Sequence, residues 1–338
     1  MRRVRRWVRP LAGAVILGAV WWRLGSGAVV DAVRGIDGSA LAAAATLAAL
    51  TTVCGAWRWV LVARGLGVEL SLRSAVAESY RSQFLNVTLP GGVLGDVRRG
   101  VRHGRAAGDL GRGLRSVVWE RSAGQVVLGV LTLGAVLLLP SPIRSSAASP
   151  PVVFALVALS ASVAAFLVAL AVTRRRGTVG TGQSGQSGRA GQVVRAVIGD
   201  VRAGVLGRRT WPGVVAASGL VVAGHVVTFL VAARSAGVTA SPLSLLPLAL
   251  LVLVAMGVPL NVAGWGPREG VAAWVFGAAG LGATAGMGTA VVYGVLVLVA
   301  SLPGAALLVV SRRDGSRDRP RDRPRVGPAV DVEGAARG

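Results

Sequence analysis

The chain is long, apolar and basic, and this combination excludes most classes of soluble protein. It has 338 residues, of which 53% are hydrophobic and only 15% are charged, with a net charge of +23 and a mean hydropathy of +0.63. A soluble domain carries about a quarter charged residues, whereas here long apolar runs alternate with short basic stretches. The sequence therefore predicts an all-α, polytopic membrane helix bundle. Nucleic-acid binding is disfavoured, because the positive charge lies in loops that flank apolar runs.

About eight apolar stretches are expected to span the bilayer, because one crossing needs about 20 apolar residues. The first follows five arginines and ends in two tryptophans, which is typical of an interfacially anchored span rather than a cleaved signal peptide. The predicted spans are residues 11–22, 39–62, 117–139, 151–172, 211–233, 242–263, 268–284 and 286–310.

The loop charges predict the orientation of these spans. Residues 96–116 hold six arginines against two aspartates, residues 173–210 hold eight against one, and the tail 311–338 holds eight against five acids. The intervening loops are nearly neutral, so basic and neutral loops alternate as the positive-inside rule requires. We expect a multi-pass protein of the plasma (cytoplasmic) membrane with both termini in the cytoplasm.

The same composition predicts one membrane domain over residues 1–310, followed by a disordered basic tail over residues 311–338. The tail repeats Arg-Asp-Arg-Pro, and the cytoplasmic segment 173–210 is rich in Gly, Ser and Gln, as flexible linkers are. No soluble domain fits beside the spans.

Two stretches interrupt the pattern of simple spans. Residues 78–97 are too polar for one helical crossing, and Pro90 with its two following glycines must stop a helix there. Residues 257–270 again join an apolar run to Pro, Gly and an Arg-Glu pair. Both are predicted to be re-entrant half-helices, which survive in the membrane only where protein or water satisfies the backbone. With eight full spans, both interruptions follow helices of the same direction, which predicts parallel repeats.

Charged residues within apolar segments are the next clue, because they are costly there and tend to face partners or a cavity. Glu120 and Arg121 lie in the predicted span 117–139, where a structural ion pair with the first re-entrant segment and a place in a binding site are both open. Arg58, between two tryptophans, is interpreted as snorkelling to the interface. His103, in a basic loop, and His225, in an apolar helix, are too far apart in sequence to suggest a metal site.

At these residues the sequence resembles the flippase-like transmembrane region of lysylphosphatidylglycerol synthases. The resemblance covers about residues 10–310 and rests on motifs that occur in the same order as in that family. They are Gln83-Phe84, Asn86, Leu89-Pro90, Gly95-Asp96 and Arg99; then Glu120-Arg121 and Gly124; then Pro259, Gly264, Gly266 and Arg268-Glu269-Gly270; and Trp57-Arg58. Leu94 replaces the first glycine of the family's Gly-Gly-Asp, which puts a close backbone approach at that point in doubt. The soluble aminoacyl-transferase domain of the full-length synthases has no counterpart here.

The leading functional hypothesis is translocation of a membrane lipid or lipid-linked headgroup by a flippase-like protein that binds the lipid phosphate. Arginine suits this task because its planar guanidinium binds phosphate with two donors. The two interruptions would line one cavity, in which Arg99 and Arg268, with Arg81 as a third, hold the phosphate. The acids would orient the arginines or engage a cationic headgroup. The candidate lipid-phosphate or substrate-binding residues are Arg81, Asn86, Pro90, Asp96, Arg99, Glu120, Arg121, Arg268 and Glu269.

Two alternatives are an intramembrane lipid-modifying transferase and a non-transporting partner of a lipid-modifying enzyme. Against an enzyme, the sequence shows no nucleophile–base pair, no metal-ligand cluster and no nucleotide-binding loop. No cofactor, metal ion or catalytic residue is therefore predicted. Membrane lipids, either anionic phospholipids or lipid-linked phosphates, are the expected partners, and a homo-oligomer or a partner enzyme stays open.

Overall fold

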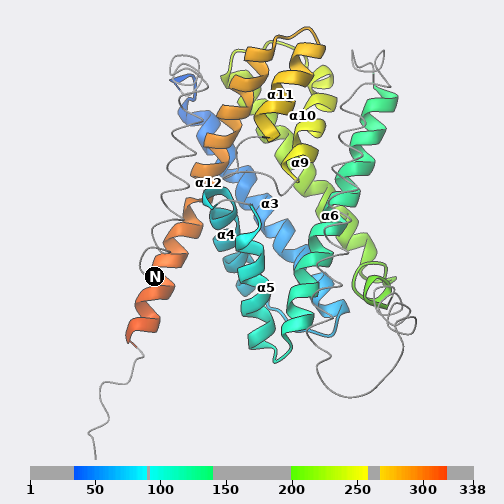
Figure 1. Ribbon diagram of the computed structural model, residues 1–338, viewed down its shortest axis with the longest axis vertical. Coiled ribbons are helices and arrows are strands. Elements are labelled where there is room, and N and C mark those ends of the chain that lie inside the picture. Colours follow the sequence, from blue (N-terminus) through cyan, green and yellow to red (C-terminus); the bar gives the residue numbers. More distant parts are fainter. Residues whose placement is uncertain (1–33, 90–91, 140–198, 258–266, 318–338) are drawn as a thin grey trace, which may run out of the picture.

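The protein is all-helical in the part of the chain that the structure describes. The computed structural model describes residues 34–89, 92–139, 199–257 and 267–317, with side chains up to residue 310 in the last range. The principal helices of this part are α3 (Gly38–Gly65), α4 (Leu72–Thr88), α5 (Leu94–Ala106), α6 (Leu110–Leu138), α9 (Trp211–Ser235), α10 (Pro242–Met256), α11 (Pro267–Ala278) and α12 (Ala283–Arg317). Figure 1 shows them as an elongated bundle. The predicted all-α, polytopic fold is confirmed.

Four of these helices, α3, α6, α9 and α12, are long and apolar enough to cross a membrane. They confirm four of the predicted spans, those at 39–62, 117–139, 211–233 and 286–310. Each helix is longer than its predicted span, because the helical backbone continues into polar residues that hydropathy alone excludes. The predicted spans 11–22 and 151–172 lie outside the described residues.

The other four helices are short and come in two pairs. α4 and α5 have 17 and 13 residues, and α10 and α11 have 15 and 12, whereas a crossing needs about 20. The stretches 242–263 and 268–284, expected as full spans, thus contain the half-length helices α10 and α11. The half-length helices expected around the first interruption, near 78–97, are found as α4 and α5. The second interruption, 257–270, falls largely on residues 258–266, which lie outside the described residues. Figure 1 shows α4 and α5 in the lower half of the bundle, and α10 and α11 in the upper half.

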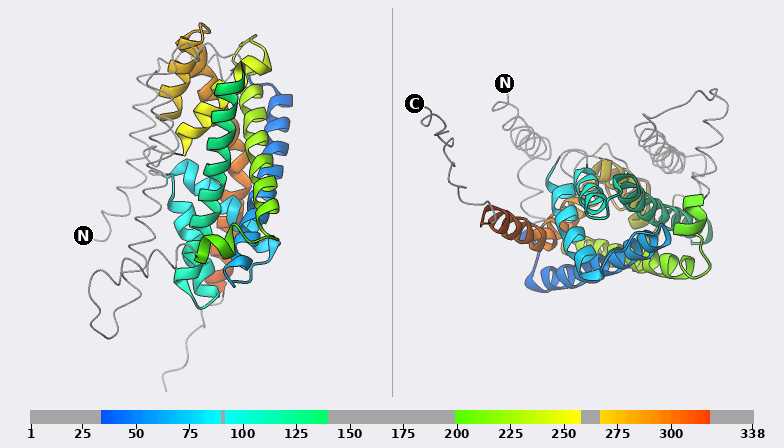
Figure 2. Two further views of the ribbon diagram at one scale, coloured as in Figure 1. Left: turned by 90° about the vertical axis from the view of Figure 1, so that its right-hand side faces the viewer. Right: turned by 90° about the horizontal axis from the view of Figure 1, so that it is seen from below.

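The helices form two structural repeats of opposite orientation. α3–α6 and α9–α12 make equivalent contacts: α5 packs on α6 as α11 packs on α12, and α10 packs on α6 as α4 packs on α12. α3 and α9 pack along each other on one side of the bundle (Figure 2), with α3 descending and α9 ascending in Figure 1. The repeats are therefore inverted, and the expected parallel arrangement was wrong. That expectation counted 242–263 as a full inward crossing, which put the second break at the same end of the bundle as the first.

A local sequence pattern marks the same repeat. The turns after α3 and α9 both read Ala-Arg-x-x-Gly-Val-x-x-Ser. Gly67 and Gly237 have φ angles of 72° and 81°, a left-handed conformation that glycine adopts at little cost. The serines then cap α4 and α10, since Ser71 Oγ and Ser241 Oγ accept hydrogen bonds from backbone N–H groups three residues later, at 3.3 and 3.2 Å. Identical turn chemistry thus starts each short helix pair.

The interiors of the two repeats differ in the side chains that they bury. In the second repeat, the rings of Phe229, Phe276 and Tyr293 pack together within the main apolar core. In the first repeat, Trp59 packs edge-on against His103, with ring centroids 5.4 Å apart, beside a group of buried charges. The first repeat therefore buries a larger group of charged side chains, whereas aromatic packing is more extensive in the second repeat.

The arginines at helix ends gather at one end of the bundle. The end of α3, the connection between α5 and α6, and the start of α9 all lie at the lower end of Figure 1. Arg64, Arg105, Arg112 and Arg208 belong to these segments. We refer to this as the basic end. At the opposite end, Arg234 donates to the carbonyl oxygen of Val238 at 2.7 Å and thereby closes the turn after α9.

Candidate ion-pair site between α3, α4, α5 and α6

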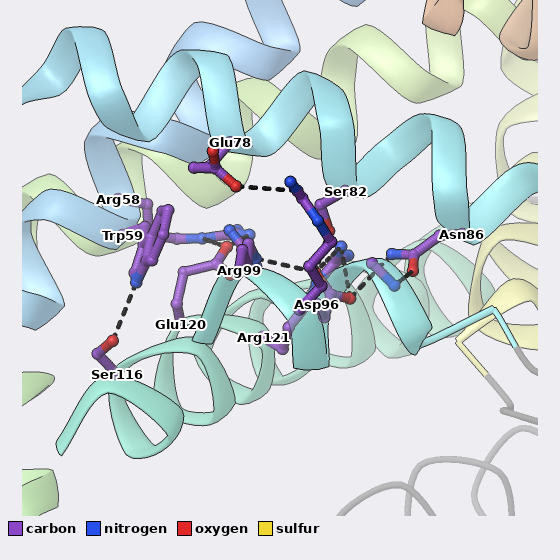
Figure 3. A network of polar contacts seen from close by, with 12 residues as sticks. Arg58, Trp59, Glu78, Ser82, Asn86, Asp96, Arg99, Ser116, Glu120 and Arg121 are labelled. Atoms are coloured by element: carbon purple, nitrogen blue, oxygen red, sulfur yellow. Dashed lines mark hydrogen bonds and ion pairs between the residues drawn. The ribbon is translucent and has the colours of Figure 1, made fainter. Parts of the chain in front are cut away.

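One polar face of α4 positions the site. Glu78, Ser82 and Asn86 are spaced four residues apart, so that they share one side of the helix. They point toward the charged side chains of α5 and α6 (Figure 3). The helix thereby presents three polar groups, one per turn, to the interior of the first repeat.

Glu120 of α6 is the centre of the charged group. Its Oε1 accepts a hydrogen bond of 2.9 Å from Arg58 Nε, and its Oε2 accepts one of 2.6 Å from Arg99 Nη2. All three side chains are buried, with 2% of Glu120, 6% of Arg58 and 3% of Arg99 exposed. Arg58 also donates from Nη1 to Ser218 Oγ of α9 at 3.0 Å. Each oxygen of the Glu120 carboxylate therefore accepts from a guanidinium group of a different helix.

The interpretation of Arg58 as a snorkelling residue is wrong. Its guanidinium points inward, because Glu120 and Ser218 offer it acceptors where the α3, α6 and α9 helices meet. Gly124 allows this, since a Cβ atom there would lie 2.7 Å from Arg58 Nη1. A paired guanidinium costs less to bury than an isolated one.

Asp96 of α5 joins the same network from the other side. Its carboxylate forms an ion pair with Arg99 Nε at 2.9 Å and accepts a hydrogen bond of 2.9 Å from Ser82 Oγ. Asn86 Nδ2 donates to it at 3.0 Å, and Arg121 Nη2 lies 2.9 Å from its Oδ2. We call Arg58, Asp96, Arg99, Glu120 and Arg121 the central cluster.

The central cluster carries more positive than negative charge. Three guanidinium groups meet two carboxylates, which leaves one positive charge in excess within the cluster. The Arg121 side chain is 47% exposed, while Asp96, to which it is paired, is 13% exposed. Arg121 is therefore the least buried arginine of the cluster and the one that can change partner at the lowest cost.

Close approach of α4 and α5 holds Asp96 in place. The Asn86 side-chain oxygen accepts a hydrogen bond of 2.8 Å from the backbone N–H of Gly95. A Cβ atom on Gly95 would lie 2.1 Å from the carbonyl oxygen of Ser82. Leu94 is 44% exposed, so its replacement of the family's first glycine disturbs nothing. The doubt about close approach is thereby removed: the glycine that matters is Gly95.

Trp59 of α3 fixes the position of Arg99. The Arg99 guanidinium carbon lies 4.7 Å from the indole centroid, a cation–π contact. Trp59 Nε1 donates to Ser116 Oγ at 3.0 Å. His103, expected in a basic loop, is instead buried on α5 against the same ring. The indole N–H is thus held by Ser116, and the face of the same ring contacts the Arg99 guanidinium.

This hydrogen bond gives a testable prediction. Trp59→Phe keeps an aromatic ring under Arg99 and removes the donor, while Ser116→Ala leaves the buried indole N–H without its acceptor. We expect Ser116→Ala to lower the free energy of unfolding by about 1–3 kcal/mol. Adding Ser116→Ala to Trp59→Phe should cost much less, as measured by denaturant unfolding in detergent. Additive effects of the two substitutions would contradict the pairing.

A second charged group lies one turn nearer the basic end. Glu78 Oε2 is 3.1 Å from Arg98 Nη1, and Glu78 Oε1 is 2.7 Å from Arg102 Nη1. Arg81, one turn further along α4, also forms an ion pair with Glu78. We call these four residues the Glu78 cluster.

The second repeat holds a separate buried pair on α11. Arg268 Nε donates to Glu269 Oε1 at 2.7 Å, and the Arg268 guanidinium carbon lies 5.8 Å from the ring centroid of Tyr293. The Tyr293 hydroxyl and His225 Nδ1 are 3.0 Å apart. His225 of α9 therefore contacts the tyrosine that lies beside this pair.

The structure groups the predicted site residues in three ways. Asn86, Asp96, Arg99, Glu120 and Arg121 come together in and around the central cluster, and the expected ion pairing of Glu120 and Arg121 with the first re-entrant segment is found. Arg81 belongs to the adjacent Glu78 cluster. Arg268 and Glu269 form their own pair on α11, in the opposite half of the bundle, rather than sharing one cluster with Arg99. Pro90 lies outside the described residues.

Several residues of the site were missed by the sequence interpretation. Glu78 and Ser82 were not selected, although their four-residue spacing with Asn86 on one helix face was a usable signal. Trp59 and Tyr293 could not be identified as site residues from the sequence, since an aromatic residue in an apolar helix ordinarily serves only in packing. Among the described residues, no group of three His, Cys, Asp or Glu side chains could hold a metal ion.

Comparison with known proteins agrees with these motifs. No curated protein and no solved structure shows a detectable similarity to the chain. The sequence profile of the lysylphosphatidylglycerol synthase TM region matches residues 8–304, which is most of the chain. The predicted resemblance is confirmed, and the chain belongs to the lysylphosphatidylglycerol synthase transmembrane-region family.

Proposed function

We propose that this membrane protein translocates a phosphate-bearing lipid headgroup across the bilayer. The observation that carries the proposal is the convergence of Arg58, Arg99 and Arg121 on only two carboxylates at membrane depth. Such charges are costly in a bilayer and mark substrate pathways. An excess of one guanidinium leaves the central cluster able to accept an anion. A role in lipid handling is also what membership of the family suggests.

The geometry supports a division of labour among the arginines. Arg58 and Arg99 share the buried Glu120 carboxylate and are held in fixed positions. Arg121 is half-exposed and is tied to Asp96 alone. An arriving phosphate would attract Arg121 away from Asp96, while the two fixed guanidinium groups supply the positive field. Asp96 and Glu120 then act by positioning the arginines.

The inverted repeat supports transport rather than static binding. Inverted repeats with half-length helices recur in transporters, in which one repeat rocks against the other around a site near the bilayer midplane. Here the first break follows α4 and the second follows α10, one in each half of the bundle. We place the basic end, together with both termini, on the cytoplasmic side of the plasma membrane, in accordance with the positive-inside rule.

Arg121→Gln tests the proposal with little risk to folding, because about half of the side chain is exposed. We expect the rate at which a labelled phospholipid changes leaflet in reconstituted vesicles to fall at least about tenfold, the effect of losing one charge-assisted contact. Arg105→Gln is the matched control: it removes the same charge from an exposed position on α5 and should leave the rate unchanged.

Two further outcomes separate the alternatives. An unchanged rate in Arg121→Gln, together with an unchanged rate in Arg99→Lys, would contradict translocation by the central cluster. A covalently altered lipid, detected by mass spectrometry after incubation with the purified protein, would instead favour a lipid-modifying transferase. Absence of lipid movement in the wild type, with a stoichiometric co-purifying enzyme, would favour a non-transporting partner.

A further inference from the structure

The Glu78 cluster has a charge balance that calls for an anion. One carboxylate receives three guanidinium groups, those of Arg81, Arg98 and Arg102. Arg98 and Arg102 thus share this one carboxylate with each other and with Arg81, so that positive charge exceeds negative charge on the exposed side of the cluster. Guanidinium groups that share one carboxylate repel one another. A phosphate bound among them would relieve this repulsion.

The Glu78 cluster has two buried members and two more exposed ones. The side chains of Glu78 and Arg81 are 9% and 12% exposed, whereas those of Arg98 and Arg102 are 34% and 54% exposed. Arg81 is also held from Nη2 by the carbonyl oxygen of Leu307 in α12, at 3.3 Å. Glu78 and Arg81 thus form a fixed base, and Arg98 and Arg102 are the two groups that can reach a ligand.

On α5, exposed apolar residues come before these arginines, which lie nearer the basic end of the bundle. Leu94 and Val97, at the start of the helix, are 44% and 50% exposed, as expected for residues that contact acyl chains. Arg98 and Arg102 follow toward the basic end, and the helical rise from Leu94 to Arg102 is about 12 Å. Apolar residues deep in the membrane and arginines near its surface are the arrangement with which helices engage anionic headgroups.

We propose that the Glu78 cluster binds the phosphate of an anionic phospholipid from the leaflet at the basic end of the bundle. Arg98 and Arg102 contact the phosphate oxygens, and Glu78 positions both arginines. The site is separate from the central cluster but adjacent to it, since Ser82, which contacts Asp96, lies one turn further along α4. Binding here does not require that the protein translocates the lipid.

A stability measurement on the full-length protein in neutral detergent tests this proposal. Short-chain phosphatidylglycerol is titrated, and the concentration that gives half of the maximal increase in melting temperature is recorded. We expect this concentration to rise about tenfold in Arg98→Gln/Arg102→Gln, as loss of charge-assisted contacts to the phosphate predicts.

Arg73→Gln/Arg105→Gln is the matched control, since it removes two exposed arginines from the same pair of helices. It should bind the lipid as the wild type does. An equal loss in this control, or no loss in Arg98→Gln/Arg102→Gln, would overturn the proposal. Inorganic phosphate that stabilises the protein at the same concentration as the lipid would show a free-anion site and would equally overturn it. The readout is binding alone, so its failure is distinguishable from failure of translocation.

Discussion

Glu120→Gln is expected to lower the free energy of unfolding by about 3–5 kcal/mol, the range found when one partner of a buried ion pair is removed. The carboxylate is 2% exposed and neutralises Arg58 and Arg99 at the same time. A glutamine of the same shape would leave two buried guanidinium groups facing one neutral amide. Unfolding in mixed detergent micelles, followed by tryptophan fluorescence, measures the loss.

Two further variants separate this effect from a general loss of negative charge. Glu69→Gln removes an exposed carboxylate in the turn before α4 and should change stability by less than about 0.5 kcal/mol. Arg58→Gln/Glu120→Gln removes one charge of each sign, so that it should be less unstable than the sum of its single substitutions. If Glu120→Gln were as stable as Glu69→Gln, the buried ion pairs would not stabilise the first repeat.

Gly95→Ala is expected to cost at least about 3 kcal/mol, at or beyond the upper end of the usual range for overpacking. The added methyl group would lie 2.1 Å from the carbonyl oxygen of Ser82 and 2.7 Å from Asn86 Oδ1. The first of these atoms belongs to the backbone of α4, so it cannot rotate away and the two short helices must separate. Asp96 would then lose its hydrogen bonds from Ser82 and Asn86. Lipid movement should fall together with stability.

Gly134→Ala is the control for this substitution. Gly134 lies within α6, and a Cβ atom there meets no atom within 4 Å. Alanine is favoured over glycine in a helix by about 1 kcal/mol, so the variant should be as stable as the wild type or slightly more stable. Equal stability of Gly95→Ala and the wild type would contradict the close packing of α4 on α5.

Prolines, glycines and hydropathy predicted some of the helix boundaries from the sequence but not all of them. Pro90 with its glycines predicted a break near 78–97, because proline ends a helix wherever the chain lies. The length of the second short pair was misjudged, since residues 242–263 are apolar throughout and hydropathy does not register where a helix turns back. The repeated turn chemistry at Gly67 and Gly237 was present in the sequence and would have revealed the repeat.

By itself, the sequence determined the long apolar helices, the two breaks and the concentration of arginine between spans, because these follow from local composition and backbone chemistry. Only the tertiary structure decided that Arg58 pairs with Glu120, 62 residues away, that Arg268 lies apart from Arg99, and that the repeats are inverted. Such pairings depend on which helix faces meet, and a buried charge is stabilised only by the partner that packing brings to it.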